Sequence, residues 1–311
     1  MKAICMRSSG GSEVLELADV AIPALQSEFD VLVRLKACAL NPVDTKIRRG
    51  AFASNPILGF DAAGIVEEAS LSAKFRPGDE VMFSGALGRA GSNAQFTVVD
   101  SRVVSLKPRE WDWAESAALP LAALTAWEML EENFNLKPFS RPKRDETLII
   151  VNGAGGVGSI ATQLARNVFG IQNVVVTASR DESVEWSKKM GATHVINHHN
   201  LLGPQLKRLG LVPSLAFICY DTPKYVQQLT AVMRPRGRIG SIVECDKPLG
   251  FESVEAFSRA LSFHWEFMFC KAVSGFDVES QGSMLAQLKE AIERGLIHSI
   301  VGERKTLSAP C

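Results

Sequence analysis

The sequence predicts an α/β protein that combines a doubly wound parallel sheet with a second, smaller β-rich domain. From residue 146 onward, short apolar runs alternate with segments whose apolar residues recur at three- and four-residue steps. This alternation is typical of a parallel sheet with helices on both faces. Before Pro120, short candidate strands follow one another with turn signals between them, which favours a small barrel-like domain. A chain of 311 residues is long enough for both cores.

Charge and cysteine content limit the possible classes of function. Lysine plus arginine and aspartate plus glutamate are balanced at 34 each, so no general basic field favours nucleic acid or a membrane surface as a partner. The six cysteines are scattered without a Cys-x-x-Cys pair, as expected of reduced thiols. No run of 18 apolar residues occurs, and the N-terminus resembles a short strand more than a signal peptide. We therefore expect a cytoplasmic protein.

The β-rich part should end in a helical patch. This patch, Ala114–Glu132, contains Pro120, which should kink or restart the helix because proline lacks the N–H of an interior helical residue. A charged loop, Pro138–Asp145, should then lead into the parallel sheet. The candidate strands before the patch are Lys2–Arg7, Leu15–Leu17, Val31–Ala37, Gly64–Glu67, Glu80–Phe83 and Gln95–Val99.

The first strand of the parallel sheet, Thr147–Val151, should end in a glycine turn. This turn has G-x-G-x-x-G spacing, opens a helical pattern and is followed by a second strand, Asn173–Thr177. In that context the glycines allow a tight turn and bring a pyrophosphate close to the helix N-terminus. The alternative is a glycine-rich turn without a ligand. The predicted cofactor contacts are Gly153, Gly155, Gly156, Val157 and Gly158.

The end of the second strand indicates which dinucleotide binds. A carboxylate about 20 residues beyond the glycines holds a free ribose 2′-hydroxyl, whereas an arginine suits a 2′-phosphate. Ala178, Ser179 and Arg180 fill this window, and the first acid, Asp181, comes one position later. We therefore predict NADPH over NADH, with Ser179 and Arg180 as contacts. The alternative is an arginine that is merely solvated at a strand end.

The chain beyond Arg180 continues the alternation of helices and strands. A last predicted helix, Ser283–Arg294, has Gly295 as its cap. The other predicted elements are the helix Glu182–Met190, the strand His194–Asn197, the helix Gln205–Leu209, the strand Leu215–Tyr220, the helix Tyr225–Met233 and the strand Arg238–Val243.

These features together resemble the medium-chain dehydrogenase/reductase superfamily. A β-rich start, an alanine-rich helix with Leu119-Pro120 and Thr125-Ala126-Trp127, and the glycine turn follow one another as in its zeta-crystallin-like quinone oxidoreductases. Three further strings are similar to the group labelled zinc-type alcohol dehydrogenase-like proteins. They are Ala178-Ser179-Arg180, Gly191-Ala192-Thr193-His194-Val195-Ile196-Asn197-His198 and His264-Trp265-Glu266-Phe267-Met268-Phe269.

The resemblance implies a domain organisation. It predicts a GroES-like β-barrel catalytic domain over residues 1–122, a Rossmann domain that binds NADPH over 123–260, and a segment over 261–311 that returns to the catalytic domain. Relatives continue with another helix and a final strand, so by resemblance this chain is C-terminally short. We expect an apolar surface and a strand edge to be left uncovered, with activity impaired. A homodimer through an edge of the nucleotide sheet is also implied.

The resemblance also allows the zinc ligands to be checked individually. Zinc-dependent relatives hold the catalytic metal with a cysteine, a histidine in a Gly-His-Glu turn and a second cysteine. Asn41, Phe60 and Leu121 occupy those places here, and zinc prefers thiolate, imidazole or carboxylate ligands. The four close cysteines of a structural zinc lobe are also missing, since no cysteine lies between Cys38 and Cys219. We therefore predict that no metal is bound.

The string Asn41-Pro42-Val43-Asp44 is similar to the Asn-Pro-x-Asp signature of the quinone oxidoreductase branch. By that resemblance Asn41 lies near the nicotinamide and donates a hydrogen bond to developing enolate charge. Asp44 either positions the site or caps the short helix that follows it. Lys46 stands where many quinone reductases carry a tyrosine near the substrate, so a proton-donor role does not transfer directly.

Further contacts follow from family position alone. Thr125, Asn197 and Ile242 are expected to face the cofactor, although a helical threonine is otherwise neutral. His198 and His199 are expected in a solvated loop, since no third metal ligand is nearby. The His264-Trp265 pair either shapes the substrate pocket or belongs to the core or a dimer contact.

The implied reaction is hydride transfer from NADPH to a quinone or to an α,β-unsaturated carbonyl compound, such as an enone, an alkenal or an enoyl substrate. Without zinc no alkoxide is activated, which disfavours plain alcohol oxidation. Quinone reduction needs little acid catalysis, because the product oxygens can take protons from water. The alternative is a non-catalytic NADPH-binding protein, either a truncated remnant or a crystallin-like structural or regulatory partner.

Overall fold

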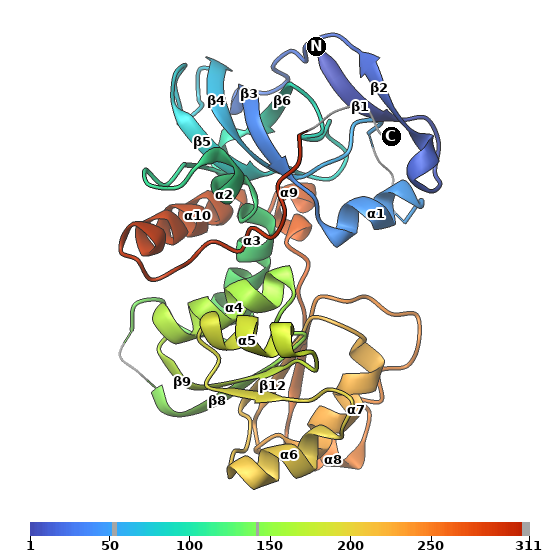
Figure 1. Ribbon diagram of the computed structural model, residues 1–311, viewed down its shortest axis with the longest axis vertical. Helices are drawn as coiled ribbons and strands as arrows, with labels where there is room; N and C mark the ends of the chain where they lie inside the picture. The colour runs from blue at the N-terminus through green and yellow to red at the C-terminus, as the bar shows by residue number, and fades with distance from the viewer. Residues whose placement is uncertain (52–54, 141–142, 307–311) are drawn as a thin grey trace. The chain divides into compact units, whose positions relative to one another are not determined.

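The computed structural model describes residues 1–51, 55–140 and 143–306, which form two compact units (Figure 1). The first unit comprises Met1–Leu124, Met268–Arg294 and the residues from Ser299 onward, and the second comprises Thr125–Phe267 and Gly295–His298. The tail at 307–311, on which the expectation of a short C-terminus partly depends, lies outside the described residues, and so does part of the predicted loop 138–145.

The second unit contains a six-stranded parallel sheet with the strand order β10-β9-β8-β11-β12-β13. The order reverses between β8 and β11, which confirms the predicted doubly wound sheet. Ligands of such sheets bind beyond the carboxyl ends of the strands at this reversal. The strands are β8 (Lys143–Val151), β9 (Ile171–Thr177), β10 (His194–Ile196), β11 (Leu215–Ile218), β12 (Arg238–Ser241) and β13 (Ser262–Trp265).

Helices cover both faces of this sheet, with α4 and α5 on one side and α6 and α8 on the other (Figure 1). Residues 148–151 of β8 are therefore all buried, because a strand covered on both faces has no polar side. Ile149 and Val151 share a core cluster with residues of α6 and α7. The helices are α4 (Gly156–Asn167), α5 (Asp181–Lys189), α6 (Leu202–Leu209), α7 (Thr222–Val232) and α8 (Val254–Ser258).

Two predicted boundaries in this unit need correction. β8 begins at Lys143, inside the predicted loop, because Lys143 pairs with Ile171 of β9 before an irregularity in the register that ends at Thr147. The segment 262–265 pairs with β12 as β13 and belongs to the nucleotide unit, whereas the resemblance placed residues 261–311 in the returning segment. The return to the first unit begins at Met268.

The first unit is built on a five-stranded antiparallel sheet with the order β6-β3-β4-β5-β7, beside a two-stranded sheet of β1 and β2. Valines of β3, β4, β5 and β6 form its apolar core. The strands are β1 (Lys2–Met6), β2 (Leu15–Asp19), β3 (Asp30–Ala39), β4 (Asp61–Ala69), β5 (Glu80–Ser84), β6 (Phe96–Asp100) and β7 (Val104–Leu106).

Pro120 restarts the helical patch, as predicted. α2 (Trp113–Ala117) ends before it, and α3 (Pro120–Glu128) begins at it and continues as a π-helical turn, Met129–Asn133. Proline suits a first helical position because the N–H it lacks would have no partner there.

The C-terminal helices differ more from the sequence expectation. A short helix, α9 (Phe269–Ser274), lies within the stretch that begins with the predicted aromatic run, and α10 (Val278–Glu293) begins at Val278 instead of Ser283. α10 packs against β7 and the 3-10 turn Ser101–Val103. A further 3-10 turn is Ser12–Val14. The remaining helix of the first unit is α1 (Pro42–Arg48).

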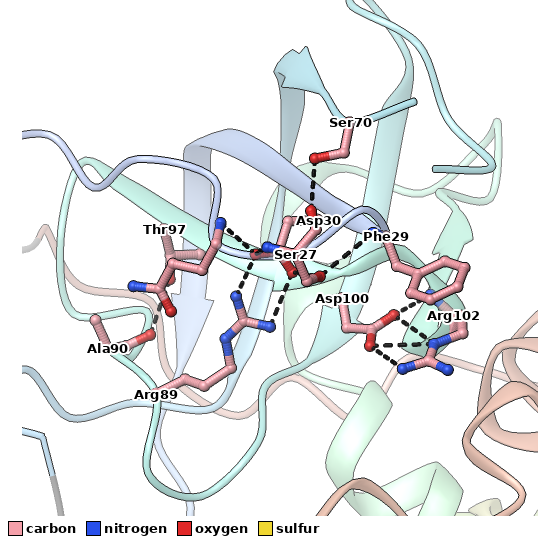
Figure 2. A network of polar contacts seen from close by, with 10 residues as sticks. Ser27, Phe29, Asp30, Ser70, Arg89, Ala90, Thr97, Asp100 and Arg102 are labelled. Carbon is pink, nitrogen blue, oxygen red and sulfur yellow. Dashed lines mark hydrogen bonds and ion pairs between the residues drawn. The ribbon is translucent and has the colours of Figure 1, made fainter. Parts of the chain in front are cut away.

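One buried ion pair fixes a long loop to the sheet of the first unit (Figure 2). Asp30 at the start of β3 is fully buried, and its two carboxylate oxygens accept hydrogen bonds from the Arg89 guanidinium at 3.0 and 2.8 Å. Gln26 N–H and the Ser27 N–H and hydroxyl also donate to Asp30. Burial by itself would raise the pKa of Asp30, but these hydrogen bonds, led by Arg89, leave the pKa below its ordinary value.

Candidate functional site

The glycine turn leaves β8 at the reversal of strand order. A β-carbon at Gly158 would lie 2.2 Å from the carbonyl oxygen of Asn152, and one at Gly153 would lie 2.4 Å from the β-carbon of Val176. A β-carbon at Gly156 would meet no atom within 4 Å. Gly153 and Gly158 are therefore required for close packing of strand and helix, whereas the space beside Gly156 is open.

The N-terminus of α4 supplies the groups that an anion would need. Gly155 is the N-cap with extended backbone, and Gly156, Val157 and Gly158 form the first turn. The N–H groups of a first helical turn have no partner within the helix and lie at its positive end. The residues present therefore fit a dinucleotide pyrophosphate, through backbone groups alone.

A cluster of cationic and polar side chains lies at the carboxyl end of β9. The Ser179 hydroxyl lies 3.2 Å from Nε2 of His198, and exposed Arg180 donates to the Ser183 hydroxyl at 3.4 Å. The pKa of His198 is lowered by partial burial and by electrostatic interaction with His199 and Lys224. Ser179 and Arg180 were predicted from the sequence; His198 was expected in a solvated loop and Lys224 was missed, because only the parallel sheet brings the ends of β9, β10 and β11 together.

The other predicted cofactor contacts of this unit are placed by the same topology. Asn197 and Ile242 directly follow β10 and β12, so they lie at the carboxyl edge of the sheet that also carries the glycine turn. The Asn197 side-chain oxygen accepts the N–H of His199 at 2.8 Å. Thr125 is a buried residue of α3. Trp265 on the edge strand β13 stacks edge-to-face on Phe263.

The Asn-Pro-x-Asp string of the first unit forms the start of α1. Asn41 is the N-cap, and the Asp44 carboxylate at the third helical position accepts the Asn41 backbone N–H at 2.7 Å. This is the reciprocal contact of a capping box. The expectation that Asp44 itself caps the helix is therefore wrong by three positions, since the helix already begins at Pro42. Lys46 lies in the same helix, one half-turn beyond Asp44.

Asp61 contacts the residues at two of the three positions that hold the metal in zinc-dependent relatives. It begins β4, is 1% exposed, and its Oδ2 accepts a hydrogen bond from the Asn41 side-chain amide at 2.8 Å. Its Oδ1 accepts the backbone N–H of Leu121, in the first turn of α3, at 2.7 Å. Burial raises the pKa of Asp61 to about 8, against the lowering effect of both hydrogen bonds.

Asp44 is the second buried carboxyl group beside Asn41. Burial raises its pKa to about 6, although the N–H groups of Asn41 and Gly59 donate to it. Its Oδ1 is buried and makes no hydrogen bond within the described part of the chain. Burial and the charges of Asp44 and Asp61 also raise the pKa of the Cys38 thiol. We call Cys38, Asn41, Asp44 and Asp61 the Asp61 cluster.

The described residues contain no group of three histidine, cysteine, aspartate or glutamate side chains arranged to hold a metal ion. Phe60 packs its ring on Phe269 at 4.6 Å between centroids, and Leu121 contributes its backbone N–H to Asp61. That no metal is bound stays a prediction, and elemental analysis of the purified protein tests it.

Comparison with known proteins decides the family. The alcohol dehydrogenase GroES-like domain matches residues 27–109, and the zinc-binding dehydrogenase family matches residues 156–259. A zinc-type alcohol dehydrogenase-like protein from Staphylococcus aureus (strain COL) is 36% identical over 269 residues, covering 86% of this chain and 79% of the relative. The chain belongs to the medium-chain dehydrogenase/reductase superfamily.

Other members of the superfamily include reductases of unsaturated carbonyl compounds and of quinones. The chloroplastic NADPH-dependent alkenal/one oxidoreductase of Arabidopsis thaliana is 30% identical over 315 residues, covering 97% of this chain and 72% of the relative. The structure of Escherichia coli quinone oxidoreductase complexed with NADPH matches with a TM-score of 0.79 and 25% identity, over 96% of this chain and 89% of that one.

The superfamily fold matches as a whole. An alcohol dehydrogenase superfamily protein from Novosphingobium aromaticivorans has a TM-score of 0.84 and 26% identity, over 96% of this chain and 88% of that chain. The predicted GroES-like and Rossmann domains are thereby confirmed. The chain is an oxidoreductase of the medium-chain type, a superfamily whose members use a nicotinamide cofactor. Among the helices described, none is long and apolar enough to cross a membrane.

Proposed function

We propose that this protein is a zinc-independent, NADPH-dependent reductase of quinones or α,β-unsaturated carbonyl compounds. The proposal rests on which residues occupy the three positions that hold the catalytic zinc in zinc-dependent relatives. The zinc-ligand places are occupied by Asn41, Phe60 and Leu121, and Asn41 is held by a buried carboxyl group. A neutral amide can donate a hydrogen bond to developing enolate or quinol oxygen, but it cannot activate an alkoxide as zinc does.

The cofactor supplies the hydride, and the chain supplies binding and orientation. The first turn of α4 would hold the pyrophosphate through backbone N–H groups. Ser179, Arg180 and His198 would hold the adenosine 2′-phosphate, with Lys224 adding positive charge. No carboxylate stands at the position that would favour a free 2′-hydroxyl, since Asp181 lies within α5.

Arg180→Ala tests the choice of cofactor. The loss of a charge-assisted hydrogen bond to a phosphate should weaken NADPH binding about 10- to 100-fold and change NADH binding little. Fluorescence titration with both cofactors measures the two dissociation constants. The exposed Arg294, in the other unit, provides a matched control as Arg294→Ala. Equal losses for NADPH and NADH would rule out the assignment of Arg180 to the 2′-phosphate.

The reaction itself is tested by following NADPH absorbance with a panel of acceptors: an ortho-quinone, a para-quinone, an alkenal, a cyclic enone and a simple aldehyde. Turnover with a quinone or an enone, but not with the aldehyde, is the expected result. Asn41→Ala should then reduce kcat about 100-fold, the usual cost of losing one donor to an oxyanion. Tight NADPH binding without turnover of any acceptor would overturn the reductase proposal in favour of a non-catalytic NADPH-binding protein.

A further inference from the structure

The orientation of the Asn41 side-chain amide determines whether it presents a donor or an acceptor to the substrate. An asparagine amide carries donors at one end and an acceptor at the other, so a rotation of 180° about its last bond replaces N–H with C=O. A carbonyl oxygen directed at developing negative charge would repel it, whereas an N–H stabilises it. Whatever holds Asn41 must therefore select one of the two orientations.

The structure assigns this selection to Asp61, as a positioning residue for Asn41. The inference deepens the proposed function and rests on the role given there to Asn41. Asp61 Oδ2 accepts the Asn41 Nδ2–H at 2.8 Å, which directs the nitrogen end of the amide toward Asp61 and leaves its second N–H available. Above its pKa of about 8 Asp61 is ionised and has only acceptors, so in that state it excludes the reversed amide, whereas the protonated carboxyl group can also donate to the oxygen of the reversed amide.

Asp61 is itself held rigidly. Its Oδ1 accepts the N–H of Leu121 at 2.7 Å, and its own carbonyl oxygen accepts the Ser92 hydroxyl at 3.0 Å. Asp61 also pairs with Ser84 of β5 and Ala39 of β3. The carboxyl group thus connects the end of β3, the start of β4 and the start of α3. Asn41 is fixed at its backbone too, because its N–H donates to Asp44.

This arrangement explains why a carboxyl group is buried at all. Moving a carboxylate out of water is costly unless hydrogen bonds compensate it, and Asp61 is 1% exposed. The carboxyl group takes the place of the glutamate in the Gly-His-Glu turn of zinc-dependent relatives, next to Phe60 in the histidine place. In this chain it orients an amide donor.

The decisive test is a double-mutant cycle between Asp61→Asn and Asn41→Ala, with kcat measured at saturating NADPH and acceptor at about pH 9, above the pKa of about 8 of Asp61. The new amide at position 61 would keep the bond to Leu121 through its oxygen and present an N–H to Asn41, which reverses the Asn41 amide. Asp61→Asn alone should lower kcat about 10- to 100-fold, as expected for a misdirected catalytic group. In the Asn41→Ala background the same change should alter kcat less than about 2-fold. Equal losses in both backgrounds would overturn the inference.

A matched control separates positioning from general damage. Asp100→Asn makes the same chemical change in the first unit, at a carboxylate paired with Arg102 away from the Asp61 cluster. It should leave kcat unchanged. A loss of kcat in Asp100→Asn as large as that in Asp61→Asn would contradict a specific role for Asp61.

A second measurement does not depend on turnover. The side-chain amide signal of Asn41 in nitrogen-15 spectra is identified by its loss in Asn41→Ala. In the wild-type protein it should shift with pH at a midpoint near 8, where Asp61 titrates, and near 6, where Asp44 titrates. The other titratable group beside Asp61 is the Cys38 thiol, whose pKa lies above its ordinary value. Asp61→Asn should remove the step near 8 and keep the step near 6.

The two measurements also separate this inference from the proposed function. If no acceptor is reduced while the amide signal follows Asp61, the reductase proposal fails and the positioning contact stands. If turnover is found but the amide signal does not respond near pH 8, the positioning inference fails and the reductase stands.

Discussion

The glycine turn of the second unit and the Asp61 cluster of the first unit, which we propose as contacts for cofactor and substrate, are built in different ways. The turn uses six consecutive residues, and its critical positions lack side chains because the backbone of α4 approaches β8 closely. The Asp61 cluster uses side chains from three segments and buries two carboxyl groups. The turn therefore depends on the absence of side-chain atoms, and the cluster depends on hydrogen bonds to buried carboxyl groups.

This difference predicts different failures. The turn should be intolerant of added volume and insensitive to pH, because its contacts are backbone groups. The first unit should tolerate small changes of volume at its polar residues, but not the loss of a hydrogen-bond partner to a buried carboxylate. The predictions below test this contrast, beginning with the largest effect.

Gly158→Ala should be the most damaging single change in the turn. Its β-carbon would lie 2.2 Å from the Asn152 carbonyl oxygen and 2.8 Å from the α-carbon of Gly153, so backbone must move. We expect a loss of about 3 kcal/mol in the free energy of unfolding and no measurable NADPH binding. Urea unfolding and NADPH titration measure these effects.

Gly156→Ala is the matched control for that change, since its β-carbon meets nothing within 4 Å. At the start of a helix, alanine should keep or slightly raise stability. A Gly158→Ala protein that unfolds at the wild-type urea concentration would show that the turn does not depend on close backbone packing.

Arg89→Ala should have the next largest effect, on the stability of the first unit. It removes the guanidinium from fully buried Asp30 (Figure 2). The Arg89 side chain is 26% exposed and other donors to Asp30 remain, so we expect a loss of about 2 kcal/mol instead of the roughly 3 to 5 kcal/mol typical of a broken buried pair. The exposed pair of Arg294 and Glu290 is the control, with an effect below about 0.5 kcal/mol.

The same variant has a defined pH dependence. The native pKa of Asp30 is lowered, so its stabilising contribution is complete above the unfolded value of about 4 and is lost as pH falls through the native pKa. The stability difference between wild type and Arg89→Ala should therefore shrink below about pH 4. A difference that is constant from pH 7 to pH 3 would exclude ionised Asp30 as its cause.

His198→Ala should have the smallest effect. His198 lies 3.2 Å from the Ser179 hydroxyl, and its lowered pKa keeps the ring neutral near pH 7. We expect about 3-fold weaker NADPH binding, since a neutral hydrogen bond contributes about 0.5 to 1.5 kcal/mol. A loss greater than that of Arg180→Ala would mean that His198, and not Arg180, makes the main contact with the 2′-phosphate.

The elements of the second unit were the most predictable part of the chain. Strand and helix alternate there with clear periodicity, and Gly153 and Gly158 stand at fixed spacing between them. The N-terminal limit of β8 was wrong because Lys143 pairs with Ile171 despite its polar neighbours. α9 was missed because its few residues follow an aromatic run that also fits a strand.

The sequence by itself predicted the doubly wound sheet and the glycine turn, and it shows Arg180 just beyond the end of β9. These depend on residues that are neighbours along the chain. Only the tertiary structure shows the partners of Asp61, His198 and Arg89. Asp61 is 20 residues from Asn41 and 60 from Leu121 along the chain. The local sequence pattern therefore does not distinguish it from an exposed aspartate. Burial and partners from distant segments set its pKa, and neither is encoded in local periodicity.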